Sequence, residues 1–212
     1  MSAPTWTVWL DAGLAVSGLA VALAVRPWRA LPADGPPWPW LAWLAVLPVL
    51  WGVDGPSGNP IAQPLSGASL LVLMAGWPLA VLALLPAALM TGWWAGLPPE
   101  LMLQRGVWLG LVPATLAMAM GAGMRRWLPN HLFIYILGRG FFITTLAGAL
   151  AALGQMLLHV GPLGLASEDL LMARVLTASG DAFITGLLVA MCVAYRPHWL
   201  ATYADRIYLP RS

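Results

Sequence analysis

The chain has 212 residues, of which 60% are hydrophobic and only 8% are charged, and it contains thirteen tryptophans and no lysine. A water-soluble domain of this size needs more charged side chains than this to cover its exterior. The composition therefore predicts an integral membrane protein, much of whose surface contacts lipid. The net charge of +2 comes from scattered arginines without a basic patch, which argues against a nucleic-acid partner.

Seven apolar runs follow one another along the chain, and most approach the roughly 20 residues that a helix needs to cross a bilayer. They fall at 5–25, 39–53, 61–76, 78–96, 106–124, 131–160 and 174–195, and a tail follows at 196–212. The third run is too short for a complete helical crossing, and prolines flank or interrupt it, which predicts a short or broken span. We therefore expect one all-α membrane domain, 1–212, built as a polytopic bundle of about seven spans.

The arginines predict the orientation of the bundle, because Lys and Arg collect in short cytoplasmic loops. Seven crossings place Arg26, Arg29, the Arg125–Arg126 pair and the arginines of the tail on one face, whereas six would place that pair outside. We expect the N-terminus outside and the C-terminus inside. Tryptophans near the span ends are predicted interfacial anchors: Trp6, Trp9, Trp28, Trp38, Trp40, Trp93, Trp94, Trp127 and Trp199.

Ionisable side chains inside membrane spans are rare and are often functional. Six lie within the predicted spans or directly beside one: Asp11, Arg105, Arg139, His159, Arg174 and Asp181. The predicted depths of Arg139 and Asp181 in the membrane differ by a distance that a long Arg side chain can bridge. Three alternatives are therefore possible for this pair: a structural ion pair, a substrate gate, or no contact. Asp11, Arg105 and Arg174 are expected to reach toward the outer interface. The predicted substrate-pathway residues are Asp181, Arg139, Arg105 and Asp11.

Histidine and cysteine give little support for a metal site or a catalytic centre. His131 and His198 belong to the inner boundary and His159 approaches the outer one, which favours interfacial or helix-capping roles over a shared metal. Cys192 lies in an apolar run and is expected to face lipid or the core. The sequence contains no nucleophile elbow, P-loop or H-E-x-x-H motif. We therefore predict no catalytic residue, no bound metal, no cofactor and no enzymatic activity.

Four segments carry a family resemblance. They are RRWLPNHLFIYILGRGFF (125–142), GDAFITGLLV (180–189), YRPHWLATYADRIYL (195–209) and, more weakly, LSGASLLVLMAGWPLAVL (65–82). In order and spacing they resemble the bacterial permeases of energy-coupling-factor transporters for cobalt and nickel, the substrate-binding M component. The resemblance implies a multi-pass protein of the bacterial inner membrane that binds substrate outside and releases it inward. It also implies a separate transmembrane coupling component and cytoplasmic ATPases as partners.

The metal ligands of that family do not carry over to this chain. The family holds its ion with the amino terminus, a histidine directly after the initiator Met, and a histidine before the Gly-Ala-rich helix, where this chain has Ser2 and Pro64. Arg105 stands where the family has an Asn ahead of its internal proline, and Asp181 replaces its Glu. Without the two imidazoles, the first shell for cobalt or nickel is lost. We expect a divergent permease for a transition-metal ion or another small solute, or else a non-transporting subunit of the same fold within a larger membrane complex.

Overall fold

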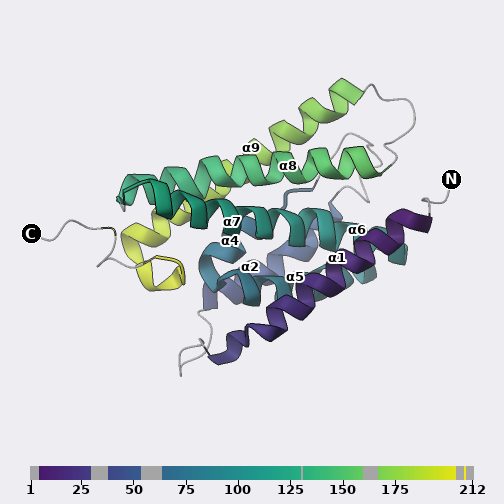
Figure 1. Cartoon of the computed structure of the whole chain (residues 1–212), viewed down its shortest axis with the longest axis horizontal. Coiled ribbons are helices and arrows are strands. Elements are labelled where there is room, and N and C mark those ends of the chain that lie inside the picture. The colour runs from purple at the N-terminus through teal and green to yellow at the C-terminus, as the bar shows by residue number, and fades with distance from the viewer. Residues whose placement is uncertain are drawn as a thin grey trace, which may run out of the picture.

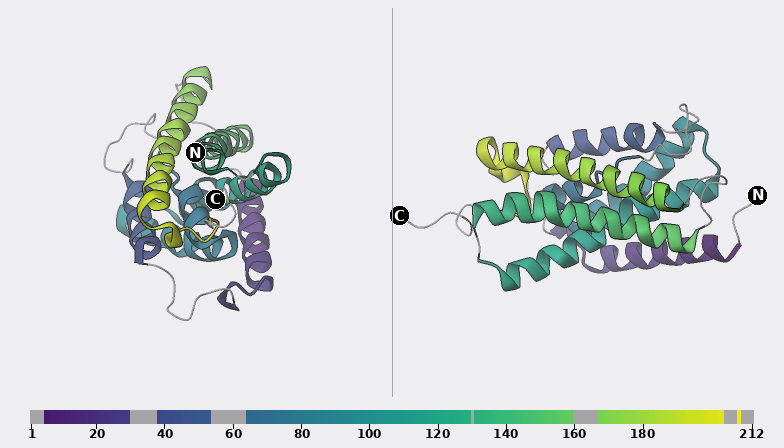
Figure 2. Two further views of the ribbon diagram at one scale, coloured as in Figure 1. Left: turned by 90° about the vertical axis from the view of Figure 1, so that its left-hand side faces the viewer. Right: turned by 90° about the horizontal axis from the view of Figure 1, so that it is seen from above.

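The computed structural model describes residues 5–29, 38–53, 64–129, 131–159, 167–203 and 208, which form helices without any strand. The helices run broadly along the long axis of one bundle (Figure 1), which Figure 2 shows end-on and from above. The longer ones are α1 (Thr5–Ala24), α2 (Trp38–Gly52), α5 (Trp77–Ala95), α7 (Val112–Trp127), α8 (Ile143–Leu158) and α9 (Ser167–Tyr195). The predicted all-α class is confirmed for this part of the chain.

Among the described residues, five helical stretches are long and apolar enough to cross a bilayer: Thr5–Ala24, Trp77–Ala95, Pro99–Trp127, Ile134–Leu158 and Glu168–Tyr195. A shorter apolar helix covers Pro39–Gly52. Large apolar side chains such as Leu157, Met172 and Leu176 are exposed on the outside of the bundle. An apolar exterior of this kind favours lipid over water as its surroundings. Helix length and surface are therefore those of a membrane protein.

Two helices extend further toward one end of the bundle than the apolar runs predict. The fifth span is expected from 106, but α6 (Pro99–Arg105) and the π-helical segment η2 (Gly106–Leu111) continue into α7. Pro99 lies in the first turn of α6, where its missing N–H leaves no helical hydrogen bond unmade. The last predicted span is expected from 174, but α9 begins at Ser167, with two acids in its first turn that suit the helix dipole. The end where α1, α6 and α9 begin is here called the Glu100 end, and the opposite end the Arg125 end.

The third apolar run is a helix of only eight residues, α4 (Ala68–Ala75), as its length and prolines predict. Residues 61–63 of the predicted run lie outside the described residues. Gly67 precedes α4 with a left-handed φ of 63°, and a Cβ there would lie 2.6 Å from Leu47 and 3.0 Å from Trp43. Only glycine meets both conditions without strain or collision. α4 is buried from Ala68 to Met74, and α2, α5, α7 and α9 pack around it.

The segment after α9 closes the Arg125 end of the interior. The backbone N–H groups of Ala201 and Thr202 donate to the carbonyls of Met74 and Leu73, at the end of α4 (3.2 and 3.3 Å). These carbonyls belong to the last turn of a helix, where helical donors run out. On the neighbouring π-helical segment η3 (Ile134–Phe142), which continues into α8, Tyr135 contacts the rings of Tyr203 and Tyr208.

The tryptophans divide between the surface and the interior. Those exposed at the helix ends agree with the predicted belt: Trp6, Trp9, Trp28, Trp93, Trp94 and Trp127. The predicted anchor Trp40 is instead buried, so that prediction is wrong, and Trp199 is half-buried against the core. The Trp38 side chain lies outside the described part. Trp51 and Trp108 are buried and use their indole N–H groups inside the bundle.

Candidate functional site

The segment 64–67 runs through the bundle interior without helical backbone. Trp51 Nε1 donates to the carbonyl of Ser66 and Trp43 Nε1 to that of Gly67, both at 2.9 Å. The N–H of Gly67 donates to Asp181 Oδ1 at 3.0 Å. Unsatisfied backbone groups in apolar surroundings are costly, so irregular backbone at membrane depth is stable only where protein groups satisfy it. Side chains of α2 and α9 supply that satisfaction here.

Ser66 connects this segment to the helix that contains η2. Its Oγ donates to the carbonyl of Leu109 at 2.6 Å and accepts the N–H of Ala68 at 3.2 Å. Pro113, four residues after Leu109, has no N–H to donate to that carbonyl in α-helical register. The sequence of η2 and α7 thus presents an acceptor in the bundle interior, and Ser66 uses it. π-helical segments such as η2 are frequent at functional sites.

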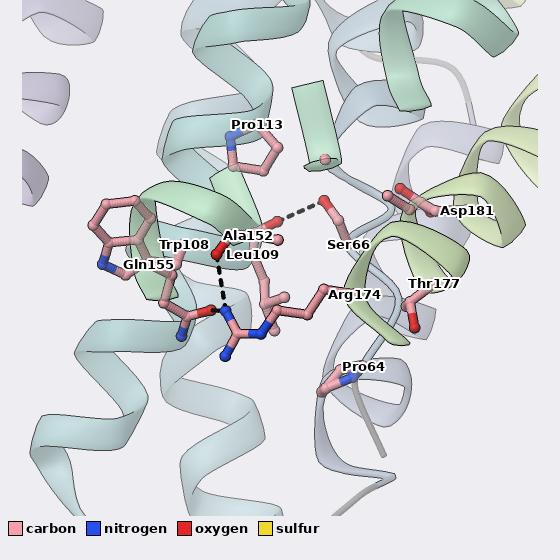
Figure 3. Close-up of a pocket in the computed structure, with 12 residues that line it drawn as sticks. Pro64, Ser66, Trp108, Leu109, Pro113, Ala152, Gln155, Arg174, Thr177 and Asp181 are labelled. Carbon is pink, nitrogen blue, oxygen red and sulfur yellow. Dashed lines mark hydrogen bonds between the residues drawn. The ribbon is translucent and has the colours of Figure 1, made fainter. Parts of the chain in front are cut away.

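A small cavity of about 30 Å³ lies beside the segment and is here called the Asp181 cavity. Its polar lining comes from Ser66, Gln155, Arg174, Thr177 and Asp181 (Figure 3). The volume is enough for a water-sized group. Asp181 is only 5% exposed, and its carboxylate at the N-terminal end of α4 has the charge that the helix dipole favours.

Arg174 reaches from α9 across the same cavity to α8, as Figure 3 shows. Its Nη1 donates to Gln155 Oε1 at 2.9 Å and to the carbonyl of Ala152 at 3.0 Å. Its Nε is buried without a hydrogen-bond partner in the described structure. The expectation that Arg174 extends toward the outer interface is therefore wrong, because the bundle itself supplies acceptors for its guanidinium.

Arg139 lies elsewhere, toward the Arg125 end. Its guanidinium carbon is 5.7 Å from the centre of the Tyr135 ring, and its Nη1 is buried without a hydrogen-bond partner in the described structure. A Cβ on Gly121 would lie 2.6 Å from the guanidinium, so this glycine provides the space that Arg139 occupies. Within the described residues, Arg139 and Asp181 form no ion pair, so of the three alternatives for this pair the structure shows no contact.

Asp11 forms a polar cluster with residues of two other helices. Its Oδ1 accepts the indole N–H of Trp108 at 2.8 Å, and its Oδ2 lies 3.0 Å from His159 Nε2. The Trp108 and His159 rings also meet edge-on at 5.6 Å. Asp11 is 2% exposed, so the prediction that it reaches the interface is wrong. A buried carboxylate needs such donors, and residues far along the chain provide them.

Arg105 is likewise buried rather than interfacial. Its guanidinium donates to the carbonyl of Trp51 in the last turn of α2. Helix C-termini attract cations because their last carbonyls lack helical donors. Arg105 thus ties α6 to the end of α2, and the prediction of an interfacial side chain is wrong for it too.

The histidines and the cysteine occupy ordinary structural positions. His131 caps its helix, since Nδ1 accepts the N–H of Phe133 at 3.2 Å, and His159 ends α8 while its ring contacts Asp11. His198 is exposed, and Cys192 lies in the core rather than in lipid. Among the residues described, no three His, Cys, Asp or Glu side chains lie close enough together to hold a metal ion.

Of the predicted pathway residues, Asp181 lines the cavity and Asp11 binds Trp108 in its wall, whereas Arg105 binds the end of α2 and Arg139 lies beside Tyr135. The prediction considered ionisable residues and therefore did not include four neutral residues that line the cavity: Ser66, Trp108, Gln155 and Thr177. A serine directly before a glycine in a proline-flanked short span was the available signal for Ser66. Together with the charged Arg174 and Asp181, Ser66, Gln155 and Thr177 give the cavity lining both hydrogen-bond donors and acceptors.

Comparison of the chain with protein-family models, with curated proteins and with solved structures found no match.

Proposed function

We propose that this chain is a divergent substrate-binding permease subunit of an energy-coupling-factor-type transporter in a bacterial inner membrane. It moves a transition-metal ion or another small solute inward. A transmembrane coupling component and cytoplasmic ATPases energise it, as the resemblance of segments such as 125–142 and 180–189 implies.

One observation carries the proposal: the non-helical segment 64–67 at the entrance of α4, with Asp181 bound to its backbone. In many transporters the substrate site is formed by discontinuous helices, with the N-terminus of a half-helix directed at the site. A fold that served only to fill a membrane has no need of irregular backbone there, since a continuous helix satisfies its own polar groups.

Seven crossings with the N-terminus outside are part of the proposal. Gly52 at the end of α2 lies against Trp94 near the end of α5, at the Glu100 end. The end of α4 lies at the Arg125 end, where it binds Ala201 and Thr202. The chain between 53 and 75 thus passes from one end of the bundle to the other, which supports counting it as a crossing.

The charges around the Asp181 cavity favour a small polar solute over a bare divalent cation. Arg174 and Asp181 line the same cavity, so a cation that approaches the carboxylate also approaches a guanidinium. A solute with both donor and acceptor groups suits the two side chains together. Hydroxyls of Ser66 and Thr177 add neutral contacts.

Two linked measurements test the proposal. First, the affinity-tagged chain is isolated from native membranes in mild detergent and its partners are identified by mass spectrometry; we expect a coupling component and an ATPase pair. Second, the complex is reconstituted in vesicles, and ATP-dependent uptake is measured for Ni²⁺, Co²⁺ and a panel of small polar solutes.

The variant Asp181→Asn should lower this uptake at unchanged protein level. The matched control is Ser179→Ala, two residues away on α9, whose exposed hydroxyl only donates to the carbonyl of Val175. Full uptake after both Asp181→Asn and Arg139→Ala removes these residues from the mechanism. A complex without ATPases that accumulates no solute contradicts the transport function itself.

The alternative is a non-transporting subunit of the same fold, packed into a larger membrane complex. An apolar groove of about 800 Å³ favours it. The groove lies along α1 and α7 and is lined by residues such as Gly18, Val21 and Leu116, a surface against which another membrane helix can pack. Stoichiometric co-purification with an assembly that lacks ATPases supports this alternative, and isolation as a free monomer contradicts it.

A further inference from the structure

A second, larger cavity lies at the Glu100 end of the bundle. It measures about 580 Å³ and is here called the Glu100 cavity. Its polar lining comes from the first two turns of α1, from α6 and from the end of α8: Thr5, Thr7, Asp11, Glu100, Gln104 and His159. Thr5 and Glu100 are exposed residues at helix starts, so this cavity opens at that end of the molecule.

Trp108 stands between the two cavities. Its side chain lines the Asp181 cavity, whereas its hydrogen-bond partner Asp11 lines the Glu100 cavity. His159, which binds the other oxygen of Asp11 and meets the indole edge-on, also lines the Glu100 cavity. Figure 3 shows Trp108 on the same side of the Asp181 cavity as Gln155. One aromatic side chain is thus shared between the wall of one cavity and the polar cluster of the other.

The packing around Trp108 shows that its position is set by this cluster. A Cβ on Gly154 would lie 2.9 Å from the indole, so the ring lies directly on the bare backbone of α8. The indole N–H and the carboxylate form a charge-assisted hydrogen bond, which is stronger and more directional than the ring's apolar contacts. Trp108 itself belongs to η2, where the helical register is widened.

We propose that Trp108 is the gate between the Glu100 cavity and the Asp181 cavity, and that Asp11 and His159 hold it closed. A polar solute enters the Glu100 cavity, and it reaches Asp181 and Arg174 when the Trp108–Asp11 contact opens. Asp11 and His159 are positioning residues in this scheme, acting through Trp108. As a step in solute transfer the gate rests on the proposed transport function, but access to the cavity is measurable without any solute.

The test measures water access to the Asp181 cavity by thiol labelling. The native Cys192, buried in the core, is first replaced by alanine. A reporter cysteine is then placed at Ala152, which is buried and lines the Asp181 cavity, or at Thr5, which is exposed and lines the Glu100 cavity. The labelling rate with a membrane-impermeant methanethiosulfonate is measured in membrane vesicles for each reporter.

Trp108→Ala should raise the labelling rate at the Ala152→Cys reporter without changing that at Thr5→Cys. Asp11→Leu and Trp108→Phe, each of which removes one partner of the Trp108–Asp11 hydrogen bond, should raise it by about tenfold, as expected for loss of one hydrogen bond to a charged group. The matched control is Trp77→Ala, which removes an indole that binds Thr115 and lines neither cavity. It should leave both rates unchanged.

Two results overturn the gate. In one, Trp108→Ala and Asp11→Leu leave labelling at Ala152→Cys at the wild-type rate. In the other, Trp77→Ala accelerates it equally, which indicates general loosening of the bundle. These results are separate from failure of the transport function, since labelling needs no partner, ATP or solute. Altered labelling with no uptake in the reconstituted complex supports the gate and contradicts transport.

Discussion

The contact between Asp181 and Gly67 allows a quantitative test of how the broken third span is held. Replacing Asp181 by leucine removes the acceptor of the Gly67 N–H, which then stays buried beside an apolar side chain. An unsatisfied buried donor costs about 1–3 kcal/mol. Since 1 kcal/mol shifts the melting temperature of a protein of this length by about 2–4 °C, we expect Asp181→Leu to lower it by about 2–12 °C.

Asparagine separates the hydrogen bond from the charge. Its Oδ1 has nearly the same position as that of aspartate and still accepts from Gly67, so Asp181→Asn should melt within about 2 °C of the wild type. Melting is followed in detergent by the fluorescence of the thirteen tryptophans. Ser179→Leu, on the same helix with an exposed hydroxyl, controls for the added apolar surface. Equal stability of Asp181→Leu and wild type refutes the reasoning, and equal loss in both Asp181 variants assigns the effect to the charge.

Three further predictions concern packing and buried hydroxyls. A Cβ on Gly140 would lie 3.2 Å from Gly186 Cα, so Gly140→Leu should force η3 and α9 apart and cost about 1–3 kcal/mol in thermal unfolding, whereas Gly123→Leu, with nothing within 4 Å of its Cβ, should cost far less. Thr185 has a buried hydroxyl without a partner in the described structure, so Thr185→Val should leave stability unchanged or raise it by about 1 kcal/mol, whereas Thr91→Val loses a 2.8 Å bond to Ala87 and should lower it; the opposite order contradicts the assignment. Thr202→Val removes hydrogen bonds to Tyr135 (2.8 Å) and Leu73 (3.1 Å), so hydrogen exchange at 200–203 should speed up by roughly fivefold per kcal/mol lost, and an unchanged rate contradicts the docking of this segment on α4.

The membrane bundle was predictable because its causes act locally along the chain. Apolar runs of sufficient length mark helices that cross a bilayer, and the prolines around 61–76 shorten the third one. Where the predicted boundaries are wrong, polar residues continue a helix past its apolar part, as at 99–105 and 167–173. The hydropathy of the sequence predicts where the lipid-facing part of a helix begins. The helix itself can begin earlier, because its first residue is set by backbone hydrogen bonding.

The partners of the buried charges were not predictable in the same way. Depth along a helix follows from sequence position, but the direction of a side chain around the helix axis and the identity of its neighbour do not. Arg139 and Asp181 have compatible depths, yet one lies against Tyr135 and the other binds Gly67. The interfacial prediction for Asp11 is wrong for the same reason, because His159, 148 residues away, lies beside it in the bundle.

The sequence by itself determined a helical membrane bundle with a short third span, because low charge, apolar run length and proline act over a few residues at a time. Only the tertiary structure decided that Ser66 and Asp181 meet at one cavity and that Trp108 in its wall binds Asp11, which lines another. In an apolar interior each buried polar group must find a partner, and packing of distant helices supplies partners that spacing along the chain does not encode.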